Sequence, residues 1–304
     1  MTSIVIAAHN EASVIGRCLD AILADAAPGE FDITVVPNGC TDSTAAVAAA
    51  RGVRVVEVAE ASKAAALNAG DRLAVGFPRI YMDADIVVDS AGVRAVARAV
   101  TPRSTVDPPL PAALAAVPTR LLAVTGRPWP VRAYFAVNSR LPAFRVGLFG
   151  RGMVAVSEEG RARFETFPLM VADDLFLDSL FAADEKACVD EVVTTVEAPR
   201  RTRHLVDRLV RVRRGNAAMR SAADAGHLAI DVRPADRSAW FRDVVRPNPR
   251  LAPAGVVYAV ISLLAAFRAK RSAHDGLAWE RDESTRLASP MATHAGPGDH
   301  EQSK

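Results

Sequence analysis

The stretch RIYMDADIVV, residues 79–88, is the segment from which the fold of this chain can be worked out. It begins with residues 80–82, which are typical of a buried strand, and continues into two acids, Asp83 and Asp85, with one small residue between them. Side chains at i and i+2 of an extended chain point to the same side. We therefore expect both carboxylates to face one point, a setting that Mg²⁺ or Mn²⁺ favours when a substrate phosphate completes the coordination shell. Because aspartate is also common at strand ends and helix starts, a purely structural role is the alternative.

The residues before this stretch alternate between strand-like and helix-like patterns. Four apolar runs, typical of buried parallel strands, are residues 4–8, 31–36, 53–58 and 80–82. Between them lie three segments with helical spacing, residues 11–24, 41–51 and 63–74. This alternation with short connections predicts an α/β fold, a doubly wound, mostly parallel sheet with helices on both faces.

Polar side chains follow three of these strands. His9, Asn10 and Glu11 follow the first strand, Asn38 follows the second, and the acid pair follows the fourth. Ligands of such sheets lie beyond the carboxyl ends of the strands, so these side chains are expected to meet at one edge. Since strands in general end in polar loops, chance placement is the alternative.

The composition bears on the partners and the cellular compartment of this protein. A chain of 304 residues with a net charge of +2 gives no general case for a nucleic-acid partner, and half of its residues are hydrophobic. The three cysteines, Cys18, Cys40 and Cys188, are scattered without metal-ligand spacing, which suits a reducing compartment. No signal peptide is recognisable before the first strand. We therefore expect a cytoplasmic catalytic face.

Four segments in the right order resemble family 2 glycosyltransferases. IVIAAHNE (residues 4–11) resembles the family's opening strand with its P-x-x-N-E loop, and VVPNGCTDST (residues 35–44) resembles V-V-D-D-G-S-T-D-x-T. KAAALNAG (residues 63–70) resembles G-K-x-x-A-L-N-x-G, and residues 83–85 fall where the family has D-x-D. The resemblance covers about the first 90 residues, and the four motifs together are specific.

This resemblance implies a GT-A fold and the transfer of a sugar from a nucleotide sugar, commonly a UDP-sugar, with a divalent metal, Mg²⁺ or Mn²⁺. It assigns Asp85 and Asp83 to the metal, with Asp83 near the ribose or a metal-bound water. It assigns seven residues to the nucleotide-sugar site: His9, Asn10, Glu11, Asn38, Lys63, Asn68 and Asp83.

The chain departs from the family pattern in both nucleotide-binding loops. Ala8 stands where the first loop usually has proline, and Pro37 and Asn38 replace the usual acidic pair. The predicted contact with the base therefore loses a charge, although the Asn38 carboxamide can still donate and accept hydrogen bonds.

A second pair of acids, Asp173 and Asp174, opens a helical pattern that runs to about Phe181. Two acids at a helix start are usually a cap and a partner of the helix dipole. The resemblance implies instead that Asp174 is the general base of an inverting enzyme, which takes the proton from an acceptor hydroxyl. It implies that Asp173 orients the site or contacts the acceptor.

Residues 199–220 are rich in arginine. The family often has a basic segment that closes over the diphosphate, which would assign Arg213 and Arg214 to the donor. A solvated basic helix face and an attraction to anionic lipid are the alternatives.

The connection between the two acid pairs is harder to interpret. Residues 101–130 have no clear period and predict a long connection, with an irregular or short helical part, that shapes the acceptor site; residues 133–137 and 153–156 predict strands. Glycines in residues 149–152 allow either a close backbone approach to a ligand or a hairpin turn.

The C-terminal region contains residues 251–267, which carry no charge and have basic residues on both sides. This segment predicts a short membrane span, a helix lying at the membrane surface (peripheral contact through residues 251–271, at the inner face of the cell membrane), or a helix packed on the catalytic domain. We expect three regions: a glycosyltransferase domain over residues 1–222 (nucleotide-sugar half 1–100, acceptor half 101–222), a helical extension over 223–288 and a disordered tail over 289–304.

The sequence thus predicts a metal-dependent, inverting glycosyltransferase whose acceptor is a glycan, a lipid or a small molecule. A sugar nucleotidyltransferase is the first rival, but it needs a glycine-rich loop after the first strand, and residues 7–11 contain no glycine. The second rival is a non-catalytic nucleotide-sugar-binding or membrane-scaffold protein on the same fold.

Overall fold

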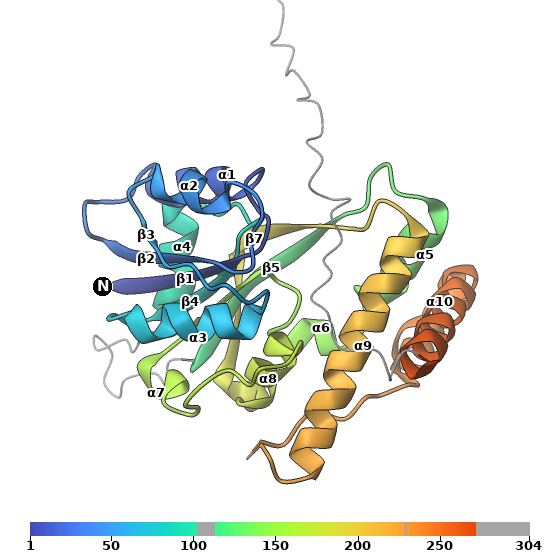
Figure 1. The fold of residues 1–304 in the computed structure, drawn as a ribbon. Coiled ribbons are helices and arrows are strands. Elements are labelled where there is room, and N and C mark those ends of the chain that lie inside the picture. Colours follow the sequence, from blue (N-terminus) through green and yellow to red (C-terminus); the bar gives the residue numbers. More distant parts are fainter. Residues whose placement is uncertain (102–112, 229, 272–304) are drawn as a thin grey trace, which may run out of the picture.

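A seven-stranded sheet with strand order β3-β2-β1-β4-β6-β5-β7 forms the centre of the molecule (Figure 1). The computed structural model describes residues 1–101, 113–228 and 230–271. The strands are β1 (Thr2–Ala8), β2 (Phe31–Pro37), β3 (Arg54–Val55), β4 (Arg79–Asp83), β5 (Ala115–Ala123), β6 (Met153–Val156) and β7 (Lys186–Glu197). β6 is antiparallel to both of its neighbours, and the other strand pairs are parallel. The predicted mostly parallel sheet is confirmed.

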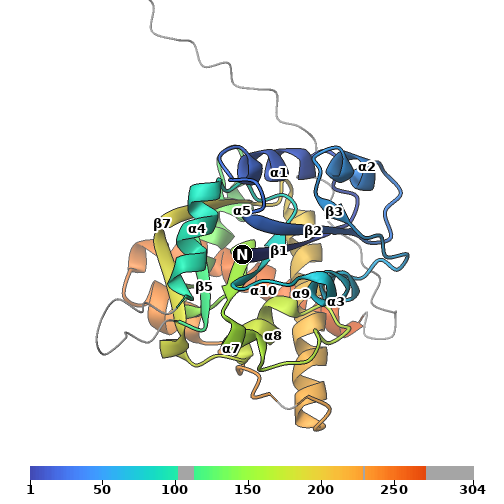
Figure 2. The same ribbon diagram turned by 90° about the vertical axis from the view of Figure 1, so that its left-hand side faces the viewer.

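Helices cover both faces of this sheet (Figures 1 and 2). One face carries α1 (Ile15–Leu23), α2 (Thr44–Ala49) and α4 (Ser90–Ala99), and the other carries α3 (Lys63–Leu73), α7 (Glu158–Arg161) and α8 (Asp173–Ser179). Alternate residues of β1 enter different cores: Ile4 and Ile6 pack with α1, whereas Val5 and Ala7 pack with α3. Because both faces are buried, β1 reads as a continuous apolar run and not as an alternating one.

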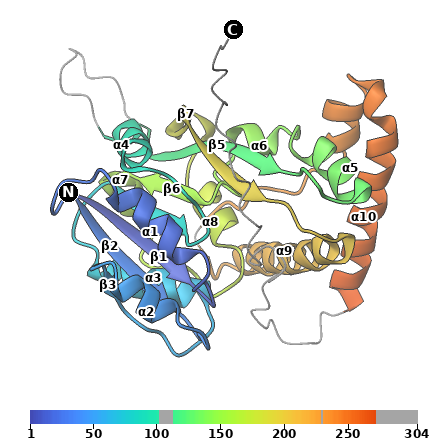
Figure 3. The same cartoon turned by 90° about the horizontal axis from the view of Figure 1, so that it is seen from above.

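The second half of the chain adds a helical layer beside the sheet. It contains α5 (Trp129–Asn138), α6 (Ala143–Val146), α9 (Thr202–Asp224) and α10 (Ala252–Arg271), with short helical turns at Ala183–Glu185, Trp240–Val245 and Pro249–Leu251. α9 runs between the sheet and α10, which forms the outer edge of the molecule (Figures 1 and 3). A third apolar cluster, with Tyr134, Leu205 and Ile261 among its members, joins α5, α9 and α10. The predicted helical extension after the catalytic domain is therefore present.

Two predictions for the middle of the chain are wrong. Residues 133–137, predicted as a strand, belong to α5, because the apolar residues Val131, Tyr134 and Phe135 recur at helical spacing and are buried on one side. Residues 101–130, predicted as an irregular connection, contain β5. Alanine-rich β5 has weak strand propensity, and its Pro118 lies at a shift in the register with β7, where proline is tolerated.

Other predictions of secondary structure are confirmed in whole or in part. Residues 153–156 form β6, as predicted, and the expected third strand is shortened to Arg54–Val55 with one further bridge between Asn38 and Val58. Asp89 caps α4 by accepting a hydrogen bond from the Gly92 amide at 2.7 Å. The domain boundary after residue 222 falls in the last turn of α9 and stays a prediction, and the predicted tail, residues 289–304, lies outside the described residues.

Candidate active site

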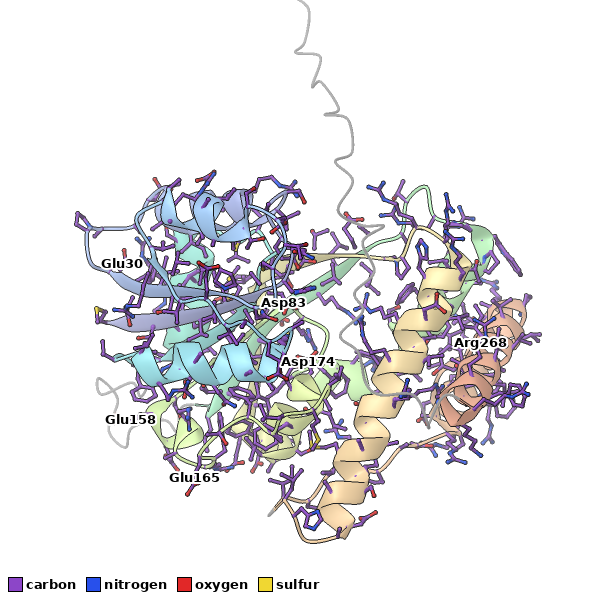
Figure 4. The ribbon with its side chains drawn as sticks, in the orientation of Figure 1. Glu30, Asp83, Glu158, Glu165, Asp174 and Arg268 are labelled. Carbon is purple, nitrogen blue, oxygen red and sulfur yellow. The ribbon has the colours of Figure 1, made fainter. Side chains whose placement is uncertain are left out.

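Lys63 is the centre of the charged cluster at the carboxyl edge of the sheet. It is the first residue of α3, and its ammonium group lies 2.9 Å from Asp83 Oδ1 and 2.7 Å from Asp173 Oδ2. Asp83 ends β4 and Asp173 begins α8, so three elements far apart in the sequence meet at this point. Asp83 and Asp174 lie close together on the side of the sheet that faces α9 (Figure 4).

The charges of this cluster act on one another. Burial alone would lower the pKa of Lys63, but the carboxylates of Asp173, Asp83 and Asp174 outweigh burial and hold that pKa well above its usual value. Lys63 is therefore a permanent cation. It offsets the repulsion among carboxylates that would otherwise oppose their convergence.

Asp174 has a pKa above the usual value of an aspartate. Burial, together with the charge of Asp173, raises the pKa of Asp174 to about 6, although Lys63 and a hydrogen bond from the Gly150 amide (3.1 Å to Oδ2) favour the ionised form. A carboxylate with a pKa near 6 is ionised at neutral pH and is still basic enough to accept a proton from a substrate.

The acid pair Asp83 and Asp85 differs in backbone from the sequence prediction. Only Asp83 belongs to β4; the chain then turns, with the Ile86 amide donating to the Asp83 carbonyl at 3.2 Å. Asp85 lies in this turn and is exposed, so the two side chains do not stand on one extended strand. Both still lie near the same spot: burial raises the pKa of the Cys18 thiol beneath them to about 12, and the charges of Asp85, Asp83 and Glu11 add to that increase.

The loop before β6 fixes both acid pairs. The Gly152 carbonyl accepts a hydrogen bond from the Asp83 amide at 2.8 Å, and the Gly150 amide binds Asp174. Gly152 has φ +73°, and a Cβ at this position would lie 2.3 Å from Ile86 Cγ1. The glycines noticed in the sequence thus permit close approach to the acids of the site, and the loop is not a hairpin turn.

The two loops after β1 and β2 are bound to each other. His9 Nδ1 lies 2.6 Å from the Asn38 carbonyl, the Glu11 amide donates to Thr44 Oγ1 at 2.8 Å, and Asn10 Oδ1 accepts from the Thr41 amide at 2.8 Å. Asn10 has φ +52°, a left-handed conformation that asparagine tolerates better than most residues. The predicted nucleotide-binding loops therefore form one unit at the same edge as the acids.

Asn38 is more buried than the sequence suggested, with only 1% of its surface exposed. Its Nδ2 donates to the Ala8 carbonyl at 2.9 Å and to the Val36 carbonyl at 3.4 Å, while its Oδ1 is buried with no hydrogen-bond partner in the described part of the chain. The side chain joins β1 to β2 beneath the rim, and its contact with a base stays a prediction.

Asn68 holds the loop that leads to Asp173 and Asp174. Its Nδ2 donates to the Phe167 carbonyl at 2.9 Å, and its Oδ1 accepts from the Phe167 amide at 2.7 Å. The structure therefore gives Asn68 a positioning role between α3 and α8. Proximity to the nucleotide stays a prediction for this residue.

The arginines of α9 point in different directions. Arg213 lies beside the α5–α10 packing: burial raises the pKa values of Tyr134 and Tyr258, and the charge of Arg213 offsets part of each increase. Gly215, about 200° further around the helix, faces the site, since a Cβ there would lie 1.6 Å from the Val171 carbonyl. Arg213 therefore lies on the side of α9 near α5 and α10, Arg214 lies between the two sides, and their contact with the diphosphate stays a prediction.

One arginine on the side of α9 that faces the sheet was not among the predicted site residues. Arg208 shares this side of the helix with Gly215, and its charge acts on Arg120 of β5. Arg120 gave no signal because it lies in the segment predicted to be irregular.

The residues present fit a divalent metal that is bound mainly by the substrate. Within residues 1–101, 113–228 and 230–271, no group of three or more His, Cys, Asp or Glu side chains could form a complete metal cage. Asp83 and Asp85 nevertheless supply hard oxygen donors, and Mg²⁺ in particular commonly takes one or two carboxylates together with water and phosphate oxygens. The exposed carboxylate of Asp85 is accessible to such an ion.

Residues 3–104 match the family model described as glycosyl transferase family 2. This part of the chain carries the sequence pattern of glycosyltransferase family 2. The matched region carries both nucleotide-binding loops, Lys63 and the acid pair of residues 83–85, and it makes the chain a glycosyltransferase by class. No curated protein sequence matches the chain.

Solved structures agree with this fold. A mannosyltransferase from Pyrobaculum calidifontis, in complex with GDP-Man and Mn²⁺, superposes with a TM-score of 0.56 at 20% identity, covering 90% of this chain and 75% of that one. A glucosyl-3-phosphoglycerate synthase from Mycobacterium tuberculosis, in complex with Mn²⁺, UDP and glucosyl-3-phosphoglycerate, gives a TM-score of 0.49 at 19% identity, covering 73% and 79% of the two chains. The first likeness supports the GT-A fold of the glycosyltransferase.

The raised pKa of Asp174 predicts a gain of stability when its charge is removed. The folded protein binds this proton up to a pH of about 6, whereas an unfolded aspartate releases it near pH 4, so ionisation of Asp174 opposes folding above this range. Asp174→Asn is expected to raise the unfolding free energy at pH 7.5 by on the order of 2–3 kcal/mol, and the gain should fade as the pH falls from 6 to 4.

Urea unfolding of wild type and variant across this pH range measures the effect. Asp184→Asn, at an exposed site, serves as the control and should change stability little at any pH. A variant that is less stable than wild type at pH 7.5 would show that the Lys63 interaction outweighs the burial of the Asp174 carboxylate.

Proposed function

We propose that this glycosyltransferase moves a sugar from a nucleoside diphosphate sugar, most simply a UDP-sugar, to an acceptor hydroxyl with inversion at the anomeric carbon. The observation that carries the proposal is the convergence of Lys63, Asp83, Asp173 and Asp174 at the carboxyl edge of a family 2 sheet. The paired loops after β1 and β2 lie at the same edge, where nucleotides bind in open α/β sheets.

Asp174 is the general base of this proposal. Its elevated pKa and its fixed orientation by the Gly150 amide support the removal of a proton from the acceptor hydroxyl as that oxygen attacks the sugar. The proton moves to Asp174, the new bond forms between the acceptor oxygen and the anomeric carbon, and the bond to the nucleoside diphosphate breaks. Direct displacement by the acceptor inverts the configuration.

Lys63 and the acids of residues 83–85 form the donor side of the site. A divalent metal held by Asp85 and Asp83 would act as a Lewis acid that stabilises the departing diphosphate. Lys63 lies against Asp83 and Asp173 and so maintains the spacing between the donor side and Asp174. Asp173 orients Lys63, which agrees with the positioning role expected from the resemblance.

α10 supports a further proposal, contact with an anionic membrane surface on the cytoplasmic side. The helical segment Pro249–Arg271 is long and apolar enough, by length and composition, to cross a membrane. Only 17% of its most apolar stretch is buried in the described structure. One side packs on α5 and α9, while five large apolar side chains on the other are exposed: Val256, Val260, Leu263, Leu264 and Phe267. Arg268, Lys270 and Arg271 follow directly, and this edge is remote from Asp83 and Asp174 (Figure 4).

A helix packed lengthwise on the catalytic domain favours lying on the membrane over spanning it. An apolar face at the acyl boundary with basic residues beside anionic headgroups is the arrangement of interfacial helices. The basic residues at the end of α10 therefore match anionic headgroups, and its exposed apolar side matches the acyl chains of a bilayer.

Donor binding is the first test. Thermal unfolding is measured with UDP-, GDP- and dTDP-sugars, each with and without Mn²⁺. We expect a metal-dependent increase in the unfolding temperature of a few degrees for one nucleotide class, because a ligand at 100 times its Kd stabilises the folded protein by about 2.7 kcal/mol. Asp85→Ala should lose the increase, and Asp184→Ala should keep it. No increase with any donor would contradict the donor site and would favour the non-catalytic protein.

Turnover tests the role of Asp174. With the donor so identified, Asp174→Asn is expected to lower kcat by about 10²–10⁴-fold while donor binding persists, since general base catalysis contributes that much. The kcat/KM of wild type should rise with pH through about 6 as Asp174 loses its proton. Release of the nucleoside diphosphate measures both, with Asp184→Asn as the control. Unchanged turnover in Asp174→Asn would exclude it as the base.

Vesicle sedimentation tests the membrane contact. Leu263→Asp, at a position 70% exposed on α10, should release the protein from phosphatidylcholine vesicles that contain phosphatidylglycerol. Val75→Asp, at an equally exposed position (70%) on another part of the surface, is the matched control. Wild type should also dissociate as salt is raised, because the basic residues are screened. Equal sedimentation of wild type and Leu263→Asp would reject this surface.

A further inference from the structure

A cavity of about 480 Å³ lies between β5, α5 and the segment around α6. Of the described residues that line it, four are arginines, Arg120, Arg132, Arg140 and Arg151, and none is an aspartate or a glutamate. The walls between these cations are apolar, with Leu122, Phe135 and Phe144 among them, and its volume is within the range of small-ligand sites.

Arg120 is the most unusual of these cations. Its guanidinium is stacked 4.4 Å over the Phe144 ring, and no carboxylate among the described residues offsets its charge. Burial, followed by the charges of Arg151 and Arg208, lowers the pKa of Arg120 to about 10. A half-buried cation among like charges is unfavourable without a counter-ion, and its donors are available to one.

Arg151 completes the inner wall of the cavity. Only 6% of its surface is exposed, and its guanidinium donates to the carbonyl oxygens of Pro118 at 3.0 Å and Phe144 at 2.7 Å. These acceptors are neutral, so the charge of Arg151 is not cancelled. Arg132 and Arg140, both exposed, stand at the opening.

The cavity lies directly beside the proposed base. A Cβ at Gly150 would lie 3.1 Å from Arg120 Nη1, and the amide of the same glycine donates to Asp174 Oδ2. One glycine therefore separates the unpaired cation from the residue that would take the acceptor proton. This proximity connects the cavity to the acceptor side of the reaction and not to the donor.

We infer that this cavity, lined by Arg120, Arg132, Arg140 and Arg151, binds a phosphate group that belongs to the acceptor. The inference rests on the proposed function, since it describes the substrate of the same site. Arg120 presents a planar fork that matches such an anion with two parallel hydrogen bonds. The apolar walls accommodate the carbon skeleton that carries the anion, and Asp174 lies beside the hydroxyl.

Phosphate binding without turnover tests the inference. Binding of a soluble phosphate is measured by calorimetric titration with inorganic phosphate and with glycerol 3-phosphate. Binding of a lipid-borne phosphate is measured by sedimentation with vesicles that contain phosphatidic acid. Saturable binding of either kind of phosphate supports the inference. Arg120→Gln should weaken binding at least about tenfold, because hydrogen bonds to charged groups are worth about 1.5–3 kcal/mol. Arg120→Lys should recover part of the affinity, since it restores the charge but not the fork.

Matched variants locate the bound phosphate. Arg17→Gln, at an exposed position on α1, should bind like wild type. Arg132→Gln, at the exposed opening, serves as a second test if Arg120→Gln does not fold. Equal affinity of wild type and folded Arg120→Gln would overturn the inference, as would the absence of saturable binding to any phosphate.

The donor measurement separates this inference from the proposed function. Loss of phosphate binding in Arg120→Gln with a retained donor-dependent thermal shift supports the cavity as an acceptor site. The absence of a donor shift in wild type would contradict the proposed transfer and, with it, the assignment of the cavity to an acceptor.

Discussion

The ammonium group of Lys63 is the interaction on which this site depends. Carboxylates from β4 and α8 could not meet at one point without a cation between them, because like charges in a half-buried place raise one another's pKa values and oppose folding. The lysine lies at the start of α3, where the helix dipole disfavours a positive charge, so the acids in turn stabilise the lysine. The lysine and the carboxylates therefore each lower the electrostatic cost of placing the other in this site.

Backbone contacts convert this electrostatic cluster into a fixed geometry. Asn68 connects α3 to the chain before α8, the loop with Gly150 and Gly152 contacts both acid pairs, and Gly215 lets α9 approach the Val171 carbonyl. None of these residues needs to touch a substrate. They show why a site assembled from distant segments can still hold its charges within hydrogen-bonding distance, as catalysis by positioned groups requires.

The first 90 residues could be predicted well because strands buried on both faces read as unbroken apolar runs and turn residues mark their ends. The prediction failed where the signals are weak. β5 is alanine-rich and interrupted by Pro118, and the run in α5 is too short to distinguish a helix from a strand. The charged cluster was recoverable from motifs, whereas Gly150, Gly215 and Arg120 act through contacts made only in the folded chain. The directions of Arg213 and Arg214 could not be predicted from the sequence, because neighbouring residues of a helix face different sides.

The left-handed backbone of Asn10 limits how this site can be re-engineered. Its neighbour Glu11 is buried but has no positive φ, whereas position 10 must satisfy a positive φ as well as the Thr41 amide. Aspartate is the simplest replacement, because it tolerates a positive φ and keeps an acceptor for the Thr41 amide; glycine would meet only the first demand, and a β-branched residue would strain the loop. Attempts to change donor preference by randomising the Asn-Glu pair would therefore sample a much smaller set of folded variants than the two positions suggest. Part of the identity of this motif is a demand of chain geometry and not of the nucleotide.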